Sequence, residues 1–395
     1  MSKTVHLLIE ARDNIGYATG TPHHDPAVWI GDENAKGVLL TSALDFGSMT
    51  SHVNSRTQVI NYSVLLKDNA TEDERTSISG NVDIAIWYLK HIGASEVIVP
   101  KNGGRSDDGM AGDYVDALRD AGFKVTYASP MFPCRERKGA DEIAMIAEAQ
   151  AVNERGFYRA FKILQDATIA ADGTLMWNGH VLTAEILRAE MCLEIYKSGS
   201  GTMEADGPII ACGLLGSDPH ERGHGPLKAG ELIVMDCFPR LPNGYWGDLT
   251  RTIIKGDIQP WQQDMFDMVL KAHDWVETQV KNGADSKAIY DGVIAMYEKA
   301  GYPTDTSIPH GMFHGVGHSV GLGLHESPGI GSRAGTLETG NVVTNEPGLY
   351  YKGYNGITGG VRIEDILVVT DKGCDNITNL PKELDVDKIK IPSDF

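Results

Sequence analysis

Four acidic residues occur at or inside apolar segments in the second half of the chain. Asp236 ends the run Leu-Ile-Val-Met, and Asp248, twelve residues later, opens Leu-Thr-Arg-Thr-Ile-Ile. Glu346 ends the run Val-Val-Thr-Asn, and Glu364 lies inside Val-Arg-Ile-Glu-Asp-Ile-Leu-Val-Val. The apolar residues predict buried strands, and a carboxylate in a buried strand is costly without a compensating charge. These four residues are therefore candidates for a site that holds cations.

A hairpin signal lies between the first two acids. Pro242-Asn-Gly-Tyr has the residue types of a tight turn, and the apolar runs on either side predict two antiparallel strands. Asp236 and Asp248 should then lie roughly opposite each other, or be offset by a bulge. Facing carboxylates repel, and each raises the pKa of the other unless a cation lies between them. In the competing interpretation, one aspartate caps the turn and the other pairs with Arg251 or Arg240.

Histidines are concentrated in the same half of the chain. Six of the thirteen fall in two short windows, which contain His220 and His224, then His310, His314, His318 and His325. The second window has no H-E-x-x-H motif, and its many glycines exclude a stable helix. On an extended chain His314 and His318 share one face, and glycines allow another backbone or a substrate to approach. Hydrogen-bonded core histidines are the alternative.

Together these segments favour a two-metal site. Four strand-embedded carboxylates and one or more histidines need positive charge if they converge, and two divalent ions supply +4 against −4. Ligands that are mostly oxygen with a single imidazole suit manganese, with cobalt, iron or zinc as chemical substitutes. For Glu364 an ion pair with Arg362, on the same strand face, is the competing interpretation.

The elements that must position these residues predict two domains. Up to residue 135 strand-like and helical segments alternate, which predicts a small α/β domain of residues 1–135. Its expected strands are Val5–Ile9, Gly37–Thr41, Glu96–Pro100 and Lys124–Ala128, and its expected helices are Val82–Ile92 and Met110–Ala121. A second domain, 136–395, has expected helices at Ala140–Ile169, Thr183–Lys197, Trp261–Lys281 and Ser286–Ala300, and expected strands at Pro208–Leu214, Glu231–Phe238 and Gly244–Lys255.

Composition narrows the class of protein and its partners. The chain has 395 residues, 42% hydrophobic and 23% charged, which is typical of a folded, soluble protein. Its net charge of −19 makes nucleic acid and anionic membranes poor partners. No run approaches the roughly 18 apolar residues of a membrane span, and the N-terminus lacks a signal-peptide core, so a cytoplasmic location is expected. Five scattered cysteines without C-x-x-C argue against disulfides and a thiolate zinc site.

The order of the motifs resembles that of the pita-bread metallopeptidases, which include aminopeptidase P, prolidase, methionine aminopeptidase and the non-peptidase creatinase. Across residues 135–385 the matching blocks are Leu-Ile-Val-Met-Asp…Gly-Asp-Leu-Thr-Arg-Thr, His-Gly-Val-Gly-His-Ser-Val-Gly-Leu…His-Glu, Asn-Glu-Pro-Gly-Leu-Tyr and Gly-Val-Arg-Ile-Glu-Asp. The resemblance implies an α+β pita-bread catalytic domain, preceded by the α/β N-terminal domain that prolidase, aminopeptidase P and creatinase share. It also makes a homodimer through the N-terminal domain the first expectation.

The same resemblance implies a ligand set. Asp236, Asp248, His318, Glu346 and Glu364 fall on the five metal-ligand positions. Asp248 and Glu364 would bridge the two ions, while Asp236 would serve one ion and His318 with Glu346 the other. A hydroxide bridging the metals would be the nucleophile, and Glu346 would be the general base and then the general acid.

Four further residues match family positions around the metals. His220 matches a substrate-side histidine, His325 the histidine that stabilises the gem-diolate oxyanion, and His314 a third pocket histidine. Arg362 matches an arginine that orients the bridging glutamate.

Two departures from the family pattern bear on the substrate. Cys237-Phe-Pro follows the first ligand, where the family usually has Asp-Ala-Gly or Asp-x-Gly. Gly329 ends His-Glu-Ser-Pro-Gly, where prolidases commonly carry an arginine for the free carboxylate of a dipeptide, and Arg333 is a candidate replacement. The missing arginine favours an Xaa-Pro aminopeptidase acting on longer peptides. The alternatives are an Xaa-Pro dipeptidase, a hydrolase of a small amide or amidine, and a peptide-binding module without catalysis.

Overall fold

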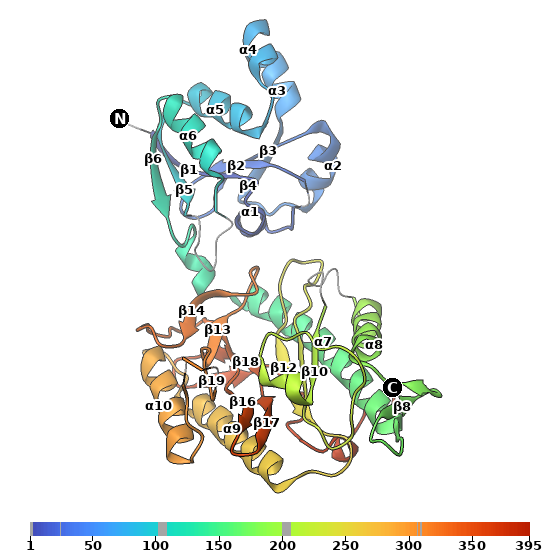
Figure 1. The fold of residues 1–395 in the computed structure, drawn as a ribbon. Coiled ribbons are helices and arrows are strands. Elements are labelled where there is room, and N and C mark those ends of the chain that lie inside the picture. The colour runs from blue at the N-terminus through green and yellow to red at the C-terminus, as the bar shows by residue number, and fades with distance from the viewer. Residues whose placement is uncertain (1–2, 24, 102–108, 200–206, 306, 309) are drawn as a thin grey trace. The chain divides into compact units, whose positions relative to one another are not determined.

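The computed structural model describes residues 3–23, 25–101, 109–199, 207–305, 307–308 and 310–395. The chain divides into two compact units, Met1–Arg135 and Glu136–Phe395 (Figure 1). Among the described residues, no helix combines the length and the apolar character needed to cross a membrane.

The first unit is built on a mixed sheet of six strands among the described residues, in the order β4-β3-β2-β1-β5-β6. These strands are β1 Lys3–Ile9, β2 Val28–Gly31, β3 Gly37–Thr41, β4 Thr57–Asn61, β5 Ala94–Pro100 and β6 Lys124–Ala128. Strand β2 runs antiparallel to β1 and β3, whereas the pairs β1–β5, β5–β6 and β3–β4 are parallel. The sequence predicted β3 and β6 with these bounds, started β1 and β5 two residues late, and missed β2 and β4.

Helices cover both faces of this sheet (Figure 1). They are α1 Arg12–Thr19, α2 Ala43–His52, α3 Tyr62–Asn69, α4 Glu72–Ser77, α5 Asn81–His91 and α6 Gly112–Asp120. Because successive strand residues point to opposite faces, Leu7 packs in the core that α5 and α6 complete, and Leu8 packs with Trp29 and the residues of α1. The sequence predicted α5 and α6 but not the four helices before them.

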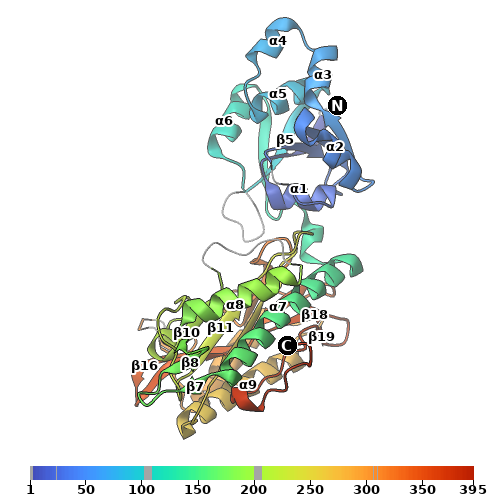
Figure 2. The same ribbon diagram turned by 90° about the vertical axis from the view of Figure 1, so that its right-hand side faces the viewer.

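The second unit begins with two helices that cover an antiparallel sheet. Helices α7 Ala140–Asp166 and α8 Ala184–Lys197 are separated by the short strands β7 Thr168–Ile169, β8 Leu175–Trp177 and β9 His180–Val181. The sheet has the order β10-β11-β12, from β10 Ile209–Cys212, β11 Ile233–Cys237 and β12 Leu249–Ile253. Figure 2 shows α7 and α8 lying over its outer face, where Phe157, Met191 and Leu249 belong to one buried cluster.

The remainder of this unit repeats that order of two helices and then a sheet. Helices α9 Pro260–Gln279 and α10 Ser286–Lys299 precede a sheet with the order β14-β13-β15-β18-β19. Its strands are β13 Gly317–Ser319, β14 Glu326–Ile330, β15 Val342–Asn345, β18 Asp365–Val369 and β19 Cys374–Asn376, and the hairpin β16 Gly348–Tyr354 with β17 Ile357–Arg362 lies between β15 and β18. The four acids singled out in the sequence therefore come from both halves: Asp236 lies in β11, Asp248 just before β12, Glu346 just after β15 and Glu364 just before β18.

The two halves meet where β12 lies beside the end of β17. The Glu364 backbone N–H donates to the carbonyl of Thr250 at 3.0 Å, and the Arg362 N–H donates to Thr252 Oγ1 at 3.0 Å. This junction brings the acid-bearing segments of the first half next to those of the second.

Candidate metal centre

Strands β11 and β12 place the first two acids on one face. Asp236 pairs with Thr250 in the ladder and Cys237 pairs with Leu249. Asp248 is two residues from Thr250, so the three side chains share a face. The aspartates lie on the same face of a paired ladder, as expected, but they are diagonal neighbours offset by two residues, and this offset arises without a bulge. Both are buried, at 9% and 4% exposure.

Helix α7 fixes the backbone at Asp248. The Asp248 N–H donates to Gln150 Oε1 at 3.0 Å, and Gln150 Nε2 donates to the Asp248 carbonyl at 2.9 Å. A side-chain amide thus satisfies both backbone groups of a residue that lies just before β12. The carboxylate is left free for other partners.

The second half contributes the other proposed ligands. Thr250 Oγ1 donates to Glu364 Oε2 at 2.7 Å, which joins the two halves at this carboxylate. His318 Nε2 lies 3.4 Å from Glu346 Oε1 and 3.6 Å from Asp248 Oδ2. Its Nδ1 faces the carbonyl of Ser319 at 3.2 Å, so Nε2 is the nitrogen that points to the acids.

A close approach of two strands sets the position of His318. The His318 N–H donates to Thr344 Oγ1 at 3.0 Å. A Cβ on Gly317 would stand 2.0 Å from the Thr344 carbonyl oxygen. Glycine is therefore required here for β13 to lie against β15, as the glycine-rich window suggested.

The cluster has the composition of a cation site. Asp248, His318 and Glu364 each offer one ligand atom, and these atoms all lie within 4.8 Å of one another. Glu346 joins them through His318. The Asp236 Oδ1 atom is buried and has no hydrogen-bond partner among the described residues. An unsatisfied buried carboxylate oxygen beside such a group fits a divalent cation.

Electrostatics supports the same assignment. Burial raises the pKa of Asp248 well above its usual value, and the charges of Glu364 and Asp236 raise it further. Burial, followed by the charges of Glu346 and Asp236, does the same for the pKa of Glu364. Without a cation these carboxylates compete for protons, whereas a bound cation would allow them to ionise together.

Arg362 is paired with Asp236. Its Nη2 donates to Asp236 Oδ2 at 2.6 Å and its Nε to Thr250 Oγ1 at 3.0 Å. Arg362 therefore forms its ion pair with Asp236 and not with Glu364, as the competing interpretation had it. It reaches Glu364 through Thr250, whose Oγ1 accepts from Arg362 Nε and donates to Glu364 Oε2, and the expected orientation of Glu364 by Arg362 stays a prediction. The two residues share a strand face, but the long arginine side chain reaches across β12 to β11. The suggested pairing of an aspartate of this group with Arg251 is also wrong, because Arg251 pairs with Asp365 at 2.8 Å.

A chain of hydrogen bonds leads from Arg362 to His314. Arg362 Nη1 donates to Tyr350 Oη at 2.8 Å, and Tyr350 Oη lies 3.0 Å from His314 Nε2. His314 Nδ1 lies 2.7 Å from the Gly315 carbonyl, which can only accept, so Nδ1 carries the proton and Nε2 accepts from the tyrosine. Burial, together with Arg362, lowers the pKa of His314 to about 4, and burial raises the pKa of Tyr350 to about 12. Both groups are neutral at neutral pH.

The two other predicted pocket histidines are exposed. The ring of His325 lies beside that of His318, with centroids 4.1 Å apart. His220 follows η2 Gly213–Ser217, and its N–H donates to Asp218 Oδ1 at 2.9 Å. It is one of the groups whose electrostatic effect lowers the pKa of His314, so the two histidines lie near each other.

Sequence reasoning missed several residues that hold the cluster together. Thr250 could have been found, because it lies two residues from Asp248 on a predicted strand and so shares its face. Tyr350 and Thr344 each lie a few residues from Glu346. The sequence did not indicate that Gln150 contacts Asp248, since a glutamine on a long amphipathic helix is usually an ordinary surface residue.

A buried ion pair supports the histidine strands. Lys138 Nζ lies 2.9 Å from Glu326 Oε2 and donates to Ser319 Oγ at 2.8 Å. The charged side chains are 1% and 2% exposed. Ser319 follows His318 and Glu326 follows His325, so a single ammonium group ties the neighbours of both histidines together.

Replacing Lys138 by methionine is predicted to destabilise the protein by about 3–5 kcal/mol, because it leaves the Glu326 charge buried without its cation. Urea unfolding of the metal-free protein measures this loss. The matched control is Lys162→Met, which removes a 2.6 Å ion pair with Asp166 on the exposed side of α7 and should cost less than about 1 kcal/mol. Equal losses in the two variants would contradict the account of this pair.

Comparisons with known proteins agree with this geometry. The model of metallopeptidase family M24 matches residues 144–371. An uncharacterized peptidase of Bacillus subtilis is 34% identical over 235 residues, which are 56% of this chain and 62% of the relative. The Xaa-Pro dipeptidase of Pyrococcus furiosus is 30% identical over 228 residues, again 56% of this chain and 62% of the relative. The sequence match thus spans less than two thirds of either relative.

A solved structure extends the likeness to nearly the whole fold. The X-Pro aminopeptidase of Thermotoga maritima matches with a TM-score of 0.77 and 19% identity, over 96% of this chain and 97% of that one. Identity at this level shows the fold alone. The expected architecture, an α/β N-terminal part followed by an α+β pita-bread part, is confirmed.

Proposed function

The chain belongs to metallopeptidase family M24, and we propose that it is a dinuclear-metal Xaa-Pro aminopeptidase. It would remove the N-terminal residue of a peptide whose second residue is proline. The observation that supports hydrolysis is the convergence of Asp248, His318 and Glu364, with Glu346 and the unsatisfied Asp236 oxygen beside them. Relatives named as dipeptidases and aminopeptidases support the Xaa-Pro class.

The proposed metal ligands are those expected from the motif. Asp248 and Glu364 would be shared by two ions, Asp236 would hold one ion through its free Oδ1, and His318 with Glu346 would hold the other. Four carboxylates and one imidazole suit manganese, with cobalt, iron or zinc as substitutes. When bound, such ions polarise the scissile carbonyl and lower the pKa of water.

The remaining residues would handle protons and charge. Glu346 Oε1 accepts a hydrogen bond from Thr344 Oγ1 at 3.2 Å and lies at the edge of the cluster, where it can accept a proton and pass it to the leaving nitrogen. His325 would donate to the oxygen that becomes negative during the attack. Neutral His314, held by Tyr350, and exposed His220 would contact the substrate.

One position favours an aminopeptidase over a dipeptidase. Gly329 pairs directly with His318 in the β13–β14 ladder, so the residue across from a proposed ligand carries no side chain. An arginine there would supply the cation for a dipeptide carboxylate, and a glycine supplies none. Arg333 is exposed and lies beyond the end of β14. A second candidate function is that of an Xaa-Pro dipeptidase, because the relative from Pyrococcus furiosus has this name.

We also propose that the chain forms a homodimer, as the family resemblance implies.

The proposal predicts metal-dependent release of the first residue from Xaa-Pro-Xaa tripeptides. Activity should disappear after chelation, return with manganese, and fall about 10²–10⁴-fold in Glu346→Gln, since the amide cannot accept the proton. The control is Glu338→Gln, which removes an exposed carboxylate 3.6 Å from Arg137. Full activity of Glu346→Gln would contradict its role, and turnover of small amides without turnover of proline peptides would contradict the substrate class.

Gly329→Arg should move the preference from tripeptides towards Xaa-Pro dipeptides, because a guanidinium beside the metal ligands can pair with the free carboxylate. The ratio of kcat/KM for the dipeptide to that for the tripeptide measures the change, and a rise of at least tenfold is expected. Arg333→Ala in the natural background should leave this ratio unchanged. A large fall in the ratio for Arg333→Ala would show that Arg333 already binds the carboxylate and would favour the dipeptidase.

A further inference from the structure

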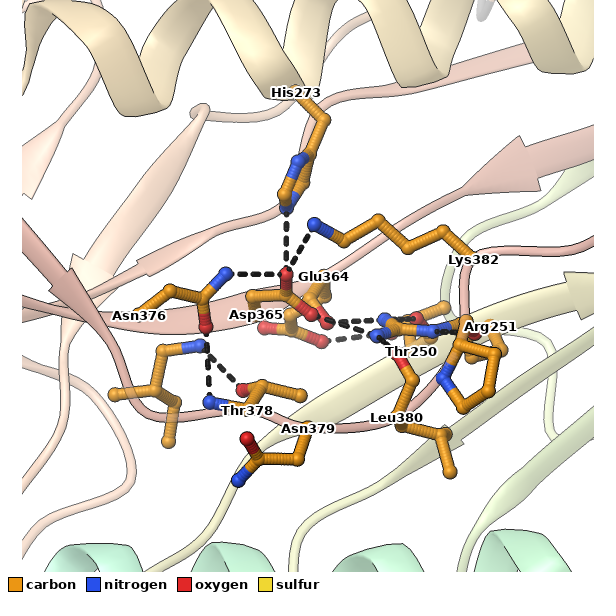
Figure 3. A network of polar contacts seen from close by, with 12 residues as sticks. Thr250, Arg251, His273, Glu364, Asp365, Asn376, Thr378, Asn379, Leu380 and Lys382 are labelled. Carbon is orange, nitrogen blue, oxygen red and sulfur yellow. Dashed lines mark hydrogen bonds and ion pairs between the residues drawn. The ribbon is translucent and has the colours of Figure 1, made fainter.

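Figure 3 shows a second polar network, formed around Arg251 and Asp365 beside Thr250 and Glu364. Arg251 follows Thr250 in β12, and Asp365 follows Glu364 at the start of β18. Because neighbouring strand residues point to opposite faces, Thr250 and Glu364 face the cluster while Arg251 and Asp365 face away from it. Arg251 is 1% exposed and Asp365 is fully buried.

Arg251 binds both strands at the positions that carry the site. Its Nη1 donates to the backbone carbonyl of Thr250 at 2.9 Å and to that of Glu364 at 2.6 Å. Its Nη2 donates to Asp365 Oδ1 at 2.8 Å. One rigid, planar guanidinium therefore spans the junction between β12 and β18, directly behind the Thr250–Glu364 hydrogen bond.

The chain after β18 completes the network. Arg251 also donates to the carbonyls of Leu380, at 2.7 Å, and Pro381, at 2.8 Å. Asp365 Oδ2 lies 2.8 Å from Lys382 Nζ and accepts from Asn376 Nδ2 at 2.8 Å. His273 Nε2 of α9 approaches the same oxygen at 3.3 Å. A carboxylate with this many donors is held in a single orientation.

We propose that Arg251 and Asp365 are positioning residues of the metal centre. They would keep Asp248 and Glu364 at the separation that two cations require. Arg251 and Asp365 would do so by fixing the backbone next to these two ligands, against the repulsion between the two carboxylates. This inference rests on the proposed metal site. It assigns a role to two residues outside that site, since neither Arg251 nor Asp365 would contact a metal or substrate. Lys382 and the segment that contains it would fix the orientation of Asp365 from outside.

Asp365→Asn tests the proposal through metal binding. The variant keeps the shape and an acceptor for Arg251 but loses the charge that holds the guanidinium. Residues that orient ligands from behind typically change metal affinity by about 10–100-fold, and a loss of that size is expected for Co²⁺ added to the metal-free protein. The cobalt absorption spectrum should also change in band position and intensity, since the ligand geometry changes.

The matched control is Asp387→Asn. Lys255 Nζ, just beyond β12, pairs with Asp387 Oδ1 at 2.7 Å and likewise ties this strand region to the C-terminal segment, but no proposed ligand adjoins the pair. Its Co²⁺ affinity and spectrum should equal those of the unsubstituted protein. If Asp365→Asn does not fold, Lys382→Met, which removes a partly exposed partner of Asp365, should weaken Co²⁺ binding in the same direction by a smaller factor.

The possible results distinguish a failure of the positioning role from a failure of the proposed metal centre. A folded Asp365→Asn or Lys382→Met that binds Co²⁺ like the control, with an unchanged spectrum, would overturn the positioning role, even if its melting temperature fell. Failure of the unsubstituted protein to bind Co²⁺ at all would instead overturn the metal centre. Weakened binding and an altered spectrum in Asp365→Asn, with neither in Asp387→Asn, would support the proposal.

Discussion

The mutual repulsion of four carboxylates is the constraint on which the second unit depends. They come from four separate segments; Asp236, Asp248 and Glu364 are buried and Glu346 is partly buried, which weakens the screening of their charges. Burial raises the pKa values of Asp248 and Glu364, and the charges of the neighbouring carboxylates raise them further. Such an arrangement persists only if the fold holds the segments together and a cation is available to compensate the charge.

Buried arginine and lysine side chains stabilise this arrangement from several sides. Arg362 lies on the same face as the carboxylates and pairs with Asp236, while Arg251 lies on the opposite face and joins β12 to the start of β18. Lys138 ties together the two strands that carry the histidines. Arg362 binds a proposed ligand directly, whereas Arg251 and Lys138 bind residues that adjoin Glu364, His318 and His325 in sequence. The positive charges therefore fix the geometry without occupying the space between Asp248 and Glu364.

Sequence patterns predicted the long elements well and the short ones poorly. Helix α7, with 27 residues, has strong apolar periodicity, and its predicted position agrees with the structure. Helices α3 and α4 have eight and six residues and little apolar periodicity, so they gave no usable signal. Strand β2, of four residues, is too short to show alternation. Too few helices and strands were consequently predicted for the N-terminal half of the first unit.

The same distinction applies to the site. Acidic residues at the ends of apolar runs drew attention to Asp236, Asp248, Glu346 and Glu364, because a charge inside a predicted strand is visible without any structure. Which cation pairs with which acid was not visible. Strand alternation permits Arg362 to reach either Asp236 or Glu364, and only the crossing of β17 with β12 decides between them.

The offset of Asp236 and Asp248 was equally hidden, since turn residues do not fix the register of a hairpin with an irregular loop. Gln150, from a helix nearly a hundred residues before Asp248, could be assigned only from the fold. Long-range contacts of this kind leave no local pattern, whereas Thr250 and Tyr350 lie close enough in sequence to the acids to be sought there.

Two divalent ions held between these carboxylates would offset the repulsion that the fold maintains. Anomalous diffraction from crystals of the manganese-loaded protein would locate such ions. We expect two anomalous peaks about 3.5–4 Å apart, with Asp248 and Glu364 both contacting the two ions and His318 contacting one. A single peak, or no peak within coordination distance of Glu364, would contradict the dinuclear centre.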